Sequence, residues 1–451
     1  METAGDLGPG VRRLRPDDHF MVLMDVPTNP LHIGALQYFE VPPGEAGGVA
    51  DRFRRQIAER LPQSPLLVEL RQSPDGYDSD VWVDVAEPDL DYHLQTIPAP
   101  IDEAGLRRFI AGRIIDRLDL SRPPFRIFLF PNVEGGRAAL YVTVHHALTD
   151  GIAFQAALSK LRDETGPAVG VRRAGALPSP EAWRAAAEAR FAAEAPLREQ
   201  KKAQVEAALA MLKSGELPRR AKTPSLKLSG PSSLERSYDA VSLPFERVRA
   251  LAKAFGGTIN DIFLAMAASA VRRRLIELDD LPEDPIVVNS ARSYRRPEHG
   301  DYGNRIVALH PHLATHIEDP VARLRAIQAS MAVERARTQY DEALLDGPER
   351  PYGARQRRER FASPGSAQLP GNVTLSNVPG PAEARFMAGF RLLANYPTPI
   401  VGLGRFLNIT SRRYAGALDL GIAADSAKFP QIQRIGAYLK DALAEYEALA
   451  G

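Results

Sequence analysis

Strand-like and helix-like segments alternate in both halves of this chain, and a stretch of different composition separates the halves. A chain of 451 residues is too long for one ordinary hydrophobic core, so two domains are expected. From about residue 171 to 235 the sequence is rich in Ala, Arg, Lys, Ser and Pro, with 12 Lys and Arg against 7 Asp and Glu. We therefore expect an N-terminal domain over residues 1–170, a helical linker over 171–235 that breaks near Pro196, and a C-terminal domain over 236–451. The intermingled elements indicate an α/β fold with mixed sheets.

The composition excludes several classes of protein. No run approaches eighteen apolar residues, and the first twenty residues lack the apolar core of a secretory signal. The absence of cysteine excludes disulfides, thiolate zinc sites and a cysteine nucleophile, and it fits a reducing cytoplasm. A formal net charge of +1 gives no overall field that favours nucleic acid, so no nucleic-acid partner is expected.

The stretch "VHHALTDG", residues 144–151, is the strongest candidate for chemistry. His145 and His146 end an extended apolar segment, Asp150 and Gly151 form a turn signal, and a helix is expected to follow. A histidine has an unperturbed pKa near ~6.5, so it can accept a proton at neutral pH. One histidine can therefore act as a base while the other packs or holds the turn. An aspartate at a tight turn usually binds backbone amides or an arginine.

Other interpretations of this chain are weaker. The two histidines could instead be core residues beside a turn aspartate, with a structural role only. The paired pattern is, however, much rarer than a lone histidine. A metal site is not expected, because adjacent histidines in a strand point to opposite faces and no third ligand stands at ligand spacing. Residues 401–406, "VGLGRF", lack the third glycine of a phosphate loop, and no Gly-x-Ser-x-Gly is present. The Arg-rich residues 353–360 form either a solvated face or a phosphate-binding site.

"HHALTDG" matches the His-His-x-x-x-Asp-Gly signature of the CoA-dependent acyltransferase superfamily. The wider sequence resembles bacterial wax ester synthase/diacylglycerol acyltransferases in "NPLHIGALQYFE", "TINDIFLAMAASAVRRRL", "GNRIVALHPHL" and "LSNVPGP", which occur in the same order. The likeness covers nearly the whole chain except the linker. One departure bears on the choice of acceptor alcohol: the family's Pro-Leu-Trp is replaced here by Pro123, Pro124 and Phe125.

The resemblance implies two similar domains, each a mixed β-sheet with flanking helices as in chloramphenicol acetyltransferase. It also implies a tunnel at the domain interface, with acyl-CoA entering from one side and an alcohol from the other. His146 would then be the general base. Asp150 would be a structural residue paired with an arginine, for which we select Arg292. Asn377 is the candidate donor to the oxyanion.

The remaining site residues are supporting ones. His145 is assigned to packing or to the turn, and Gly151 completes the motif. Asn260 and Asp261 correspond to the family's Asn-Asp motif. The resemblance implies acyl-CoA as a substrate and no cofactor.

The expected function is acyl-CoA-dependent O-acyl transfer to diacylglycerol, giving triacylglycerol, or to a long-chain alcohol, giving wax ester. Two alternatives remain: a condensation-type or other specialised acyltransferase of the same fold, and a non-catalytic relative that binds acyl-CoA or lipid. The expected location is cytoplasmic, peripheral on the inner membrane or on lipid inclusions. The large apolar residues of the linker would either contact lipid or pack on the domains: Trp183, Phe191, Leu197, Val205, Leu209 and Leu212.

Overall fold

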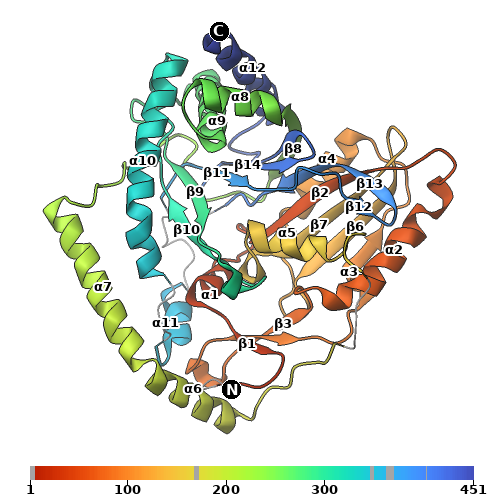
Figure 1. The fold of residues 1–451 in the computed structure, drawn as a ribbon, viewed down its shortest axis with the longest axis vertical. Helices are drawn as coiled ribbons and strands as arrows, with labels where there is room; N and C mark the ends of the chain where they lie inside the picture. Colours follow the sequence, from red (N-terminus) through yellow and green to blue (C-terminus); the bar gives the residue numbers. More distant parts are fainter. Residues whose placement is uncertain (1–5, 167–171, 346–349, 362–369, 403) are drawn as a thin grey trace.

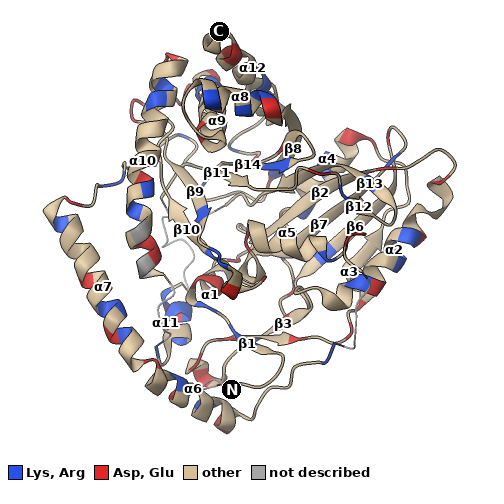
Figure 2. Cartoon of the chain, in the orientation of Figure 1, with Lys and Arg blue, Asp and Glu red and all other residues tan. Residues whose placement is uncertain are grey.

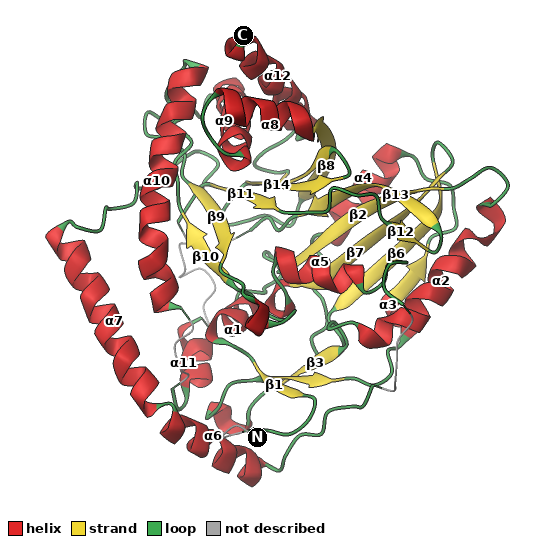
Figure 3. Cartoon of the chain, viewed as in Figure 1, coloured by secondary structure: helices red, strands yellow, loops and turns green. Residues whose placement is uncertain are grey.

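The computed structural model describes residues 6–166, 172–345, 350–361, 370–402 and 404–451 (Figure 1). The described strands form two six-stranded sheets, in the orders β12-β13-β2-β7-β6-β5 and β10-β9-β11-β14-β15-β8, and one three-stranded sheet, β1-β4-β3. Helices cover these sheets (Figure 3), so the expected α/β fold with mixed sheets is confirmed.

The first large sheet carries the histidine motif at the end of β7. Its strands are β12 (Phe386–Met387), β13 (Phe390–Thr398), β2 (His32–Glu40), β7 (Arg137–His145), β6 (Phe125–Val133) and β5 (Leu94–Thr96). Its helices are α2 (Val49–Arg60), α3 (Leu90–His93), α4 (Glu103–Arg113) and α5 (Gly151–Ser159). Leu140 and Val142 pack with α2 and α5 on one face, and Tyr141 packs with α4 on the other. Both faces of β7 are buried, which explains why the strand is almost continuously apolar.

The second large sheet has one apolar and one polar face. Its strands are β10 (Ile306–Leu309), β9 (Val288–Ser293), β11 (Val373–Val378), β14 (Leu407–Tyr414), β15 (Ala417–Asp425) and β8 (Arg236–Pro244). Its helices are α8 (Phe245–Ala254), α9 (Ile259–Glu277), α10 (Pro320–Leu344) and α12 (Gln433–Ala450). Val373 and Leu375 of β11 are buried in the core with α9, whereas Thr374 and Ser376 between them line a cavity. The two-residue period of a strand thus separates the core from the cavity.

Strand β13 links the two halves of the chain. It comes late in the sequence, yet it pairs antiparallel with β2, with Tyr396 opposite Leu36. It also lies against the second sheet, because a Cβ atom at Gly421 of β15 would come within 1.7 Å of the Pro397 carbonyl oxygen. The two large sheets therefore do not separate at one point of the sequence.

The small sheet lies at the N-terminal end beside the linker. It contains β1 (Val11–Arg13), β4 (Val81–Asp84) and β3 (Val68–Arg71), near α1 (Pro16–Leu23), α6 (Pro180–Ala193) and α11 (Gly353–Arg360). The short 3-10 helices are η1 (Ala46–Gly48), η2 (Leu61–Gln63), η3 (Pro74–Gly76), η4 (His146–Leu148) and η5 (Pro297–His299). The Arg-rich stretch forms α11, where Arg358 binds both carboxylate oxygens of Asp80 at 2.9 Å. This guanidinium is already paired with a carboxylate of the protein, which favours a packing role for Arg358 over phosphate binding.

The linker forms two helices with a break at the expected place. Helix α6 ends at Ala193, and α7 (Ala195–Ser214) begins with Pro196 in its first turn. Trp183 is buried beside Val81, and its indole nitrogen donates to Asp78 Oδ2 at 2.9 Å. The packing alternative therefore holds for Trp183 and for the buried Phe191. A lipid contact through these two rings is wrong, because the small sheet covers Trp183 and Phe191 is buried against Tyr77, with ring centroids 5.5 Å apart.

Helix α7 lies at the outer edge of the molecule (Figure 1) and carries several basic residues (Figure 2). Among its residues only Ala208 is buried. Leu197 is 54% exposed and Leu209 is 50% exposed, and Val205 is also exposed. In the described part of the chain, no single helix is both long and apolar enough to span a membrane. One pair of consecutive helices, α8 and α9, has the required length and composition when the two are taken together, but they are bent by 100° relative to each other.

Candidate active site

The histidine motif forms a tight connection between β7 and α5. The strand ends at His145, and His146 begins the short helix η4, so the expected strand is one residue too long. Asp150 is the N-cap of α5: its Oδ1 accepts from the backbone nitrogens of Ile152 at 3.0 Å and Ala153 at 2.9 Å. An aspartate at this position satisfies two amides that have no partner within the helix. The predicted turn and helix are confirmed.

His145 holds the turn from inside. Its side chain is buried, and Nδ1 accepts from the Ala147 backbone nitrogen at 3.1 Å. Its Nε2 lies 3.6 Å from Asp25 Oδ2, which also accepts from Arg117 Nε at 3.1 Å. Burial raises the pKa of Asp25, but its contacts with His145 and Arg117 outweigh burial and leave it below its usual value. The geometry fits the packing and turn role expected of His145. Its partner Asp25 was not among the residues predicted from the sequence.

His146 presents its ring to a cavity. The side chain is partly exposed, it lines the cavity, and Nδ1 is enclosed by protein, so Nε2 is the nitrogen left to face the cavity. Burial lowers the pKa of His146, although its own backbone carbonyl and the charge of Asp150 act in the opposite direction. The ring is therefore neutral at neutral pH and is able to accept a proton.

The aspartate of the motif is paired with an arginine, but the predicted partner is wrong. Arg295, not Arg292, donates to Asp150 Oδ2 at 2.8 Å. Arg292 lies in β9 opposite Val307 and lines the cavity. Strand β9 ends at Ser293, and the loop that follows folds back over the motif and brings Arg295 to it. Sequence spacing cannot show that reversal of direction.

Three consecutive loop residues from the second half of the chain also bind the motif. Gly303 N donates to Leu148 O at 2.9 Å, and Arg305 N donates to Asp150 Oδ2 at 2.9 Å. Between them, the Asn304 side-chain nitrogen donates to His146 O at 2.7 Å. We call residues 303–305 the motif-binding loop. It fixes the main chain of the candidate base from outside its own sheet.

Asp18 of helix α1 holds the motif-binding loop in place. Its Oδ1 accepts from both the backbone and the side-chain nitrogen of Asn304, each at 2.8 Å. Gly303 has a φ of +64°, and a Cβ atom there would lie 2.7 Å from Asp18 Oδ2, so this position requires glycine. Burial raises the pKa of Asp18 to about 6, against the effect of these hydrogen bonds. Asp18 and Asn304 were both missed from the sequence, because nothing in their spacing links them to the histidines.

The other predicted residues separate into cavity-lining and structural ones. Asn377 lines the cavity, and its Oδ1 accepts from Ser411 Oγ at 3.0 Å, which leaves its NH2 group as the available donor. Gly151 also lines the cavity, beside Val378. Asn260 lines the cavity as well. Asp261 instead forms a capping box with Thr258 at the start of α9, so its role is structural.

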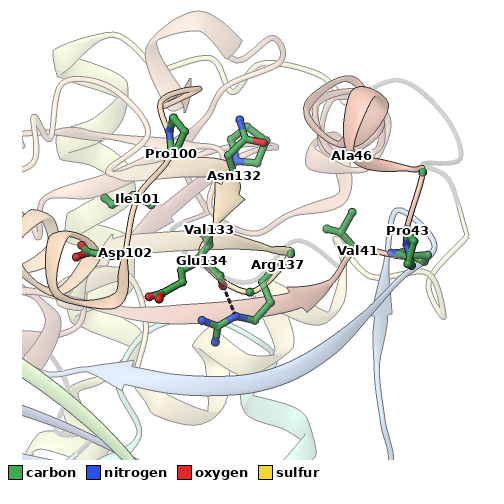
Figure 4. Close-up of a pocket in the computed structure, with 15 residues that line it drawn as sticks. Val41, Pro43, Ala46, Pro100, Ile101, Asp102, Asn132, Val133, Glu134 and Arg137 are labelled. Atoms are coloured by element: carbon green, nitrogen blue, oxygen red, sulfur yellow. Dashed lines mark hydrogen bonds between the residues drawn. The ribbon is translucent and has the colours of Figure 1, made fainter.

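The cavity has a volume of about 660 Å³ and lies between the two large sheets. Its wall includes residues of β2, η4, α5, β9, β11, β13 and β14, so it joins the histidine motif to the polar face of the second sheet. A different pocket of about 730 Å³ lies at the opposite end of β2 and β7, around Val41 and Arg137 (Figure 4). Within the described ranges, no group of three or more His, Asp or Glu residues is arranged to hold a metal ion.

Comparisons with known proteins identify the family of this chain. Residues 14–263 match the wax ester synthase/diacylglycerol acyltransferase catalytic domain, and residues 302–447 match the C-terminal domain of that family. A putative diacylglycerol O-acyltransferase of Mycobacterium tuberculosis is 31% identical over 466 residues, which cover 97% of this chain and all of that protein.

Solved structures share the fold. The wax ester synthase/diacylglycerol acyltransferase of Marinobacter aquaeolei VT8 matches with a TM-score of 0.69 and 24% identity, over 97% of this chain and 100% of that one. The starter condensation domain of rhizomide synthetase matches with a TM-score of 0.58 and 13% identity, over 98% of this chain and 94% of that one. At these identities the structures show the fold alone, and the family follows from the sequence matches. The chain therefore belongs to the wax ester synthase/diacylglycerol acyltransferase family and is an acyltransferase.

Proposed function

We propose that this acyltransferase moves a long-chain acyl group from acyl-CoA to the hydroxyl group of a lipid alcohol, with His146 as the general base. The observation that carries the proposal is the His146 ring, which lines the cavity while its main chain is fixed by Asn304, and burial lowers the pKa of this ring. A base works best when its position is held and its proton-accepting form predominates. Acyl-CoA is a substrate in this reaction, and the reaction needs no further cofactor.

The chemical steps balance without a covalent enzyme intermediate. The acceptor oxygen attacks the thioester carbon while His146 Nε2 takes the hydroxyl proton. The carbonyl oxygen becomes an oxyanion, and we assign its binding to the NH2 group of Asn377, since Ser411 occupies the other end of that amide. The tetrahedral intermediate then breaks its carbon–sulfur bond, and the leaving CoA sulfur receives the proton from His146. The products are an ester and free CoA.

The acceptor is a diacylglycerol or a long-chain alcohol. Part of the cavity wall is apolar, with Met21, Leu31, Ile33 and Phe154, and such a surface suits an alkyl chain. The departure from Pro-Leu-Trp lies elsewhere: Phe125 is buried in β6 and stacks on His93 with ring centroids 4.3 Å apart. It would therefore influence the choice of acceptor only through packing of the first sheet.

Water-insoluble substrates require contact with a lipid surface, and helix α7 is the best candidate for it. We propose a cytoplasmic protein that binds peripherally to the inner membrane or to lipid inclusions. The exposed Leu197, Val205 and Leu209, with Lys202 and Lys213 on the same helix, support such contact.

The test is an assay of free thiol release from palmitoyl-CoA in the presence of either a diacylglycerol or hexadecanol. We expect release that depends on the acceptor and produces the matching ester. His146→Ala should lower the rate about 10²–10⁴-fold with an unchanged melting temperature. Near wild-type turnover in the pure variant would exclude His146 as the base, and acyl-CoA binding without turnover in the wild type would favour the non-catalytic alternative.

A further inference from the structure

Arg405 is a buried guanidinium that lines the active-site cavity without a carboxylate partner. The residue is 6% exposed and lies two residues before the start of β14. One terminal nitrogen donates to Pro370 O at 2.9 Å, and Nε is enclosed without a partner. Among the residues that the structure describes, no carboxylate oxygen lies within 4.0 Å of it. Burial lowers the pKa of Arg405 to about 10, so the group is still charged at neutral pH. A buried cation of this kind is stabilised by an anion.

The charges along the cavity wall favour an anionic ligand. Arg292, Arg335 and Arg412 line it together with Arg405. The one carboxylate among the described lining residues is Asp150, and Arg295 neutralises it. The side chains that line the cavity therefore carry an excess of positive charge, and of these arginines only Arg335 has a carboxylate within 4.0 Å among the described residues, that of Asp261.

A row of neutral polar side chains lies on the same wall as Arg405. Asn289, Thr374 and Asn408 are neighbours across β9, β11 and β14, and all three line the cavity. Ser376 and Thr410 form the next pair along the same face. Hydroxyl and amide side chains can bond the amides and hydroxyl of a ligand, whereas an alkyl chain offers them no partner.

This row leads away from the histidine motif. Val378, at the end of β11, contacts Gly151 at the start of α5. Thr374 lies four residues earlier in the same strand, a distance of about 13 Å. Arg405 lies three residues before Asn408, the partner of Thr374 in β14, and is therefore farther still from the motif. A ligand that reaches from His146 to Arg405 needs a long arm with polar groups along it.

We propose that Arg405 binds a phosphate group of acyl-CoA and that the polar row receives the pantetheine arm. The inference rests on the proposed function, since it takes acyl-CoA as the substrate. The pantetheine arm carries two amides and a hydroxyl between the thioester and the phosphates. In the same way, the polar row lies between the histidine motif and Arg405. The acyl chain and the alkyl chain of the acceptor then share the apolar part of the cavity around Met21, Leu31 and Phe154. Arginine suits this site because its fork of donors binds phosphate oxygens in pairs.

The experiment compares two thioesters and three variants. Palmitoyl-CoA carries phosphates and palmitoyl-pantetheine does not, so only the first can use Arg405. The variants are Arg405→Gln, Arg405→Lys, which keeps the charge and loses the fork, and Arg323→Gln as a matched control. Arg323 is likewise a buried guanidinium, 3% exposed, and it donates to the backbone oxygens of Ile317 at 2.9 Å and Glu318 at 3.0 Å, but it does not line the cavity. Melting temperatures establish that each variant is folded.

We expect Arg405→Gln to raise the KM for palmitoyl-CoA about ten- to hundredfold, the usual range for a lost charge-assisted hydrogen bond. The KM for palmitoyl-pantetheine should stay unchanged, and Arg405→Lys should have an intermediate effect. An equal rise for both thioesters, or a rise with palmitoyl-CoA in Arg323→Gln alone, would overturn the proposal.

Direct binding separates this inference from the proposed function. Calorimetry with free CoA and with pantetheine measures recognition without turnover. Weaker CoA binding in Arg405→Gln with unchanged pantetheine binding supports the phosphate site, even if no acceptor is found. Equal CoA binding by wild type and Arg405→Gln contradicts the phosphate site, even if acyl transfer is active. If Arg405→Gln does not fold, Arg405→Lys carries the same comparison.

Discussion

At the scale of single residues, Asp150 contributes through its contacts with two parts of the molecule. One oxygen caps α5, and the other accepts from Arg295 and from the backbone of Arg305. We predict that Asp150→Ala lowers the free energy of unfolding by about 3–5 kcal/mol, because Arg295 is left as an uncompensated, nearly buried charge. Urea unfolding measures the loss.

Asp150→Asn is the matched control for that prediction. The asparagine oxygen can still cap α5, so this variant should lose less stability than Asp150→Ala. If Asp150→Ala unfolds like the wild type and is nevertheless inactive, Asp150 takes part in the chemistry instead.

The residues that sequence could predict are those whose role follows from neighbours in the chain. His145, His146 and Asp150 act within one turn, so their spacing indicated a base, a turn residue and a cap. Asp25 and Arg295 reach the motif only through long-range folding, and no local pattern marks them. The prediction of Arg292 is wrong because β9 ends at Ser293 and the chain then reverses direction. This reversal brings Arg295, and not Arg292, to Asp150.

At the scale of elements, the motif-binding loop couples the second half of the chain to the catalytic turn. Asn304→Ala removes the donor to His146 O and one donor to Asp18. We predict a two- to tenfold lower kcat, with a loss of about 1–3 kcal/mol in unfolding free energy, because two buried acceptors lose a partner. Asn132→Ala is the control, since its side chain makes a 2.7 Å bond to Pro98 O beside the distant pocket. Equal kcat values in both variants would show that the loop does not position the base.

Helix α7 is the second element with a testable role. We predict that the wild type co-sediments with vesicles containing phosphatidylglycerol, and less so in high salt, because exposed basic groups contribute to the binding. Replacing Leu197, Val205 and Leu209 with serine should reduce sedimentation. Replacing the exposed Ala203, Ala207 and Ala210 with serine is the control and should have little effect. Sedimentation that is the same for both triple variants would assign α7 to linking the domains only.

The linker shows which structural features local sequence patterns can predict and which they cannot. Helix propensity and Pro196 predicted two helices and their break, since both effects are local. Which apolar residues of those helices are buried depends on the small sheet, which covers Trp183 and leaves Leu209 exposed. The pairing of β13 with the first large sheet likewise could not be predicted from the sequence, because its partner β2 lies more than three hundred residues earlier.

At the scale of the whole molecule, the two halves form one structure with buried histidines in each. His32 in the first sheet contacts Thr143 Oγ1 at 2.7 Å, and His310 follows β10 in the second. Burial lowers the pKa of each to about 4. An unfolded histidine titrates near ~6.5, so between pH 6.5 and 4 the unfolded chain binds more protons than the folded one. Stability is therefore fully present above about pH 6.5 and falls as the pH drops toward 4.

The size of this effect can be isolated at His32. A pKa lowered from ~6.5 to about 4 corresponds to about 3 kcal/mol. Asp18, whose pKa is raised to about 6, partly offsets the change in the wild type because its folded form binds the extra proton. We predict that His32→Gln, which cannot titrate, flattens the fall in unfolding free energy between pH 6.5 and 4 by about that amount, measured by urea unfolding. The exposed His316→Gln should keep the wild-type slope. A slope in His32→Gln as steep as in the wild type would mean that the first sheet opens to water before the molecule unfolds, and that the two halves do not unfold together.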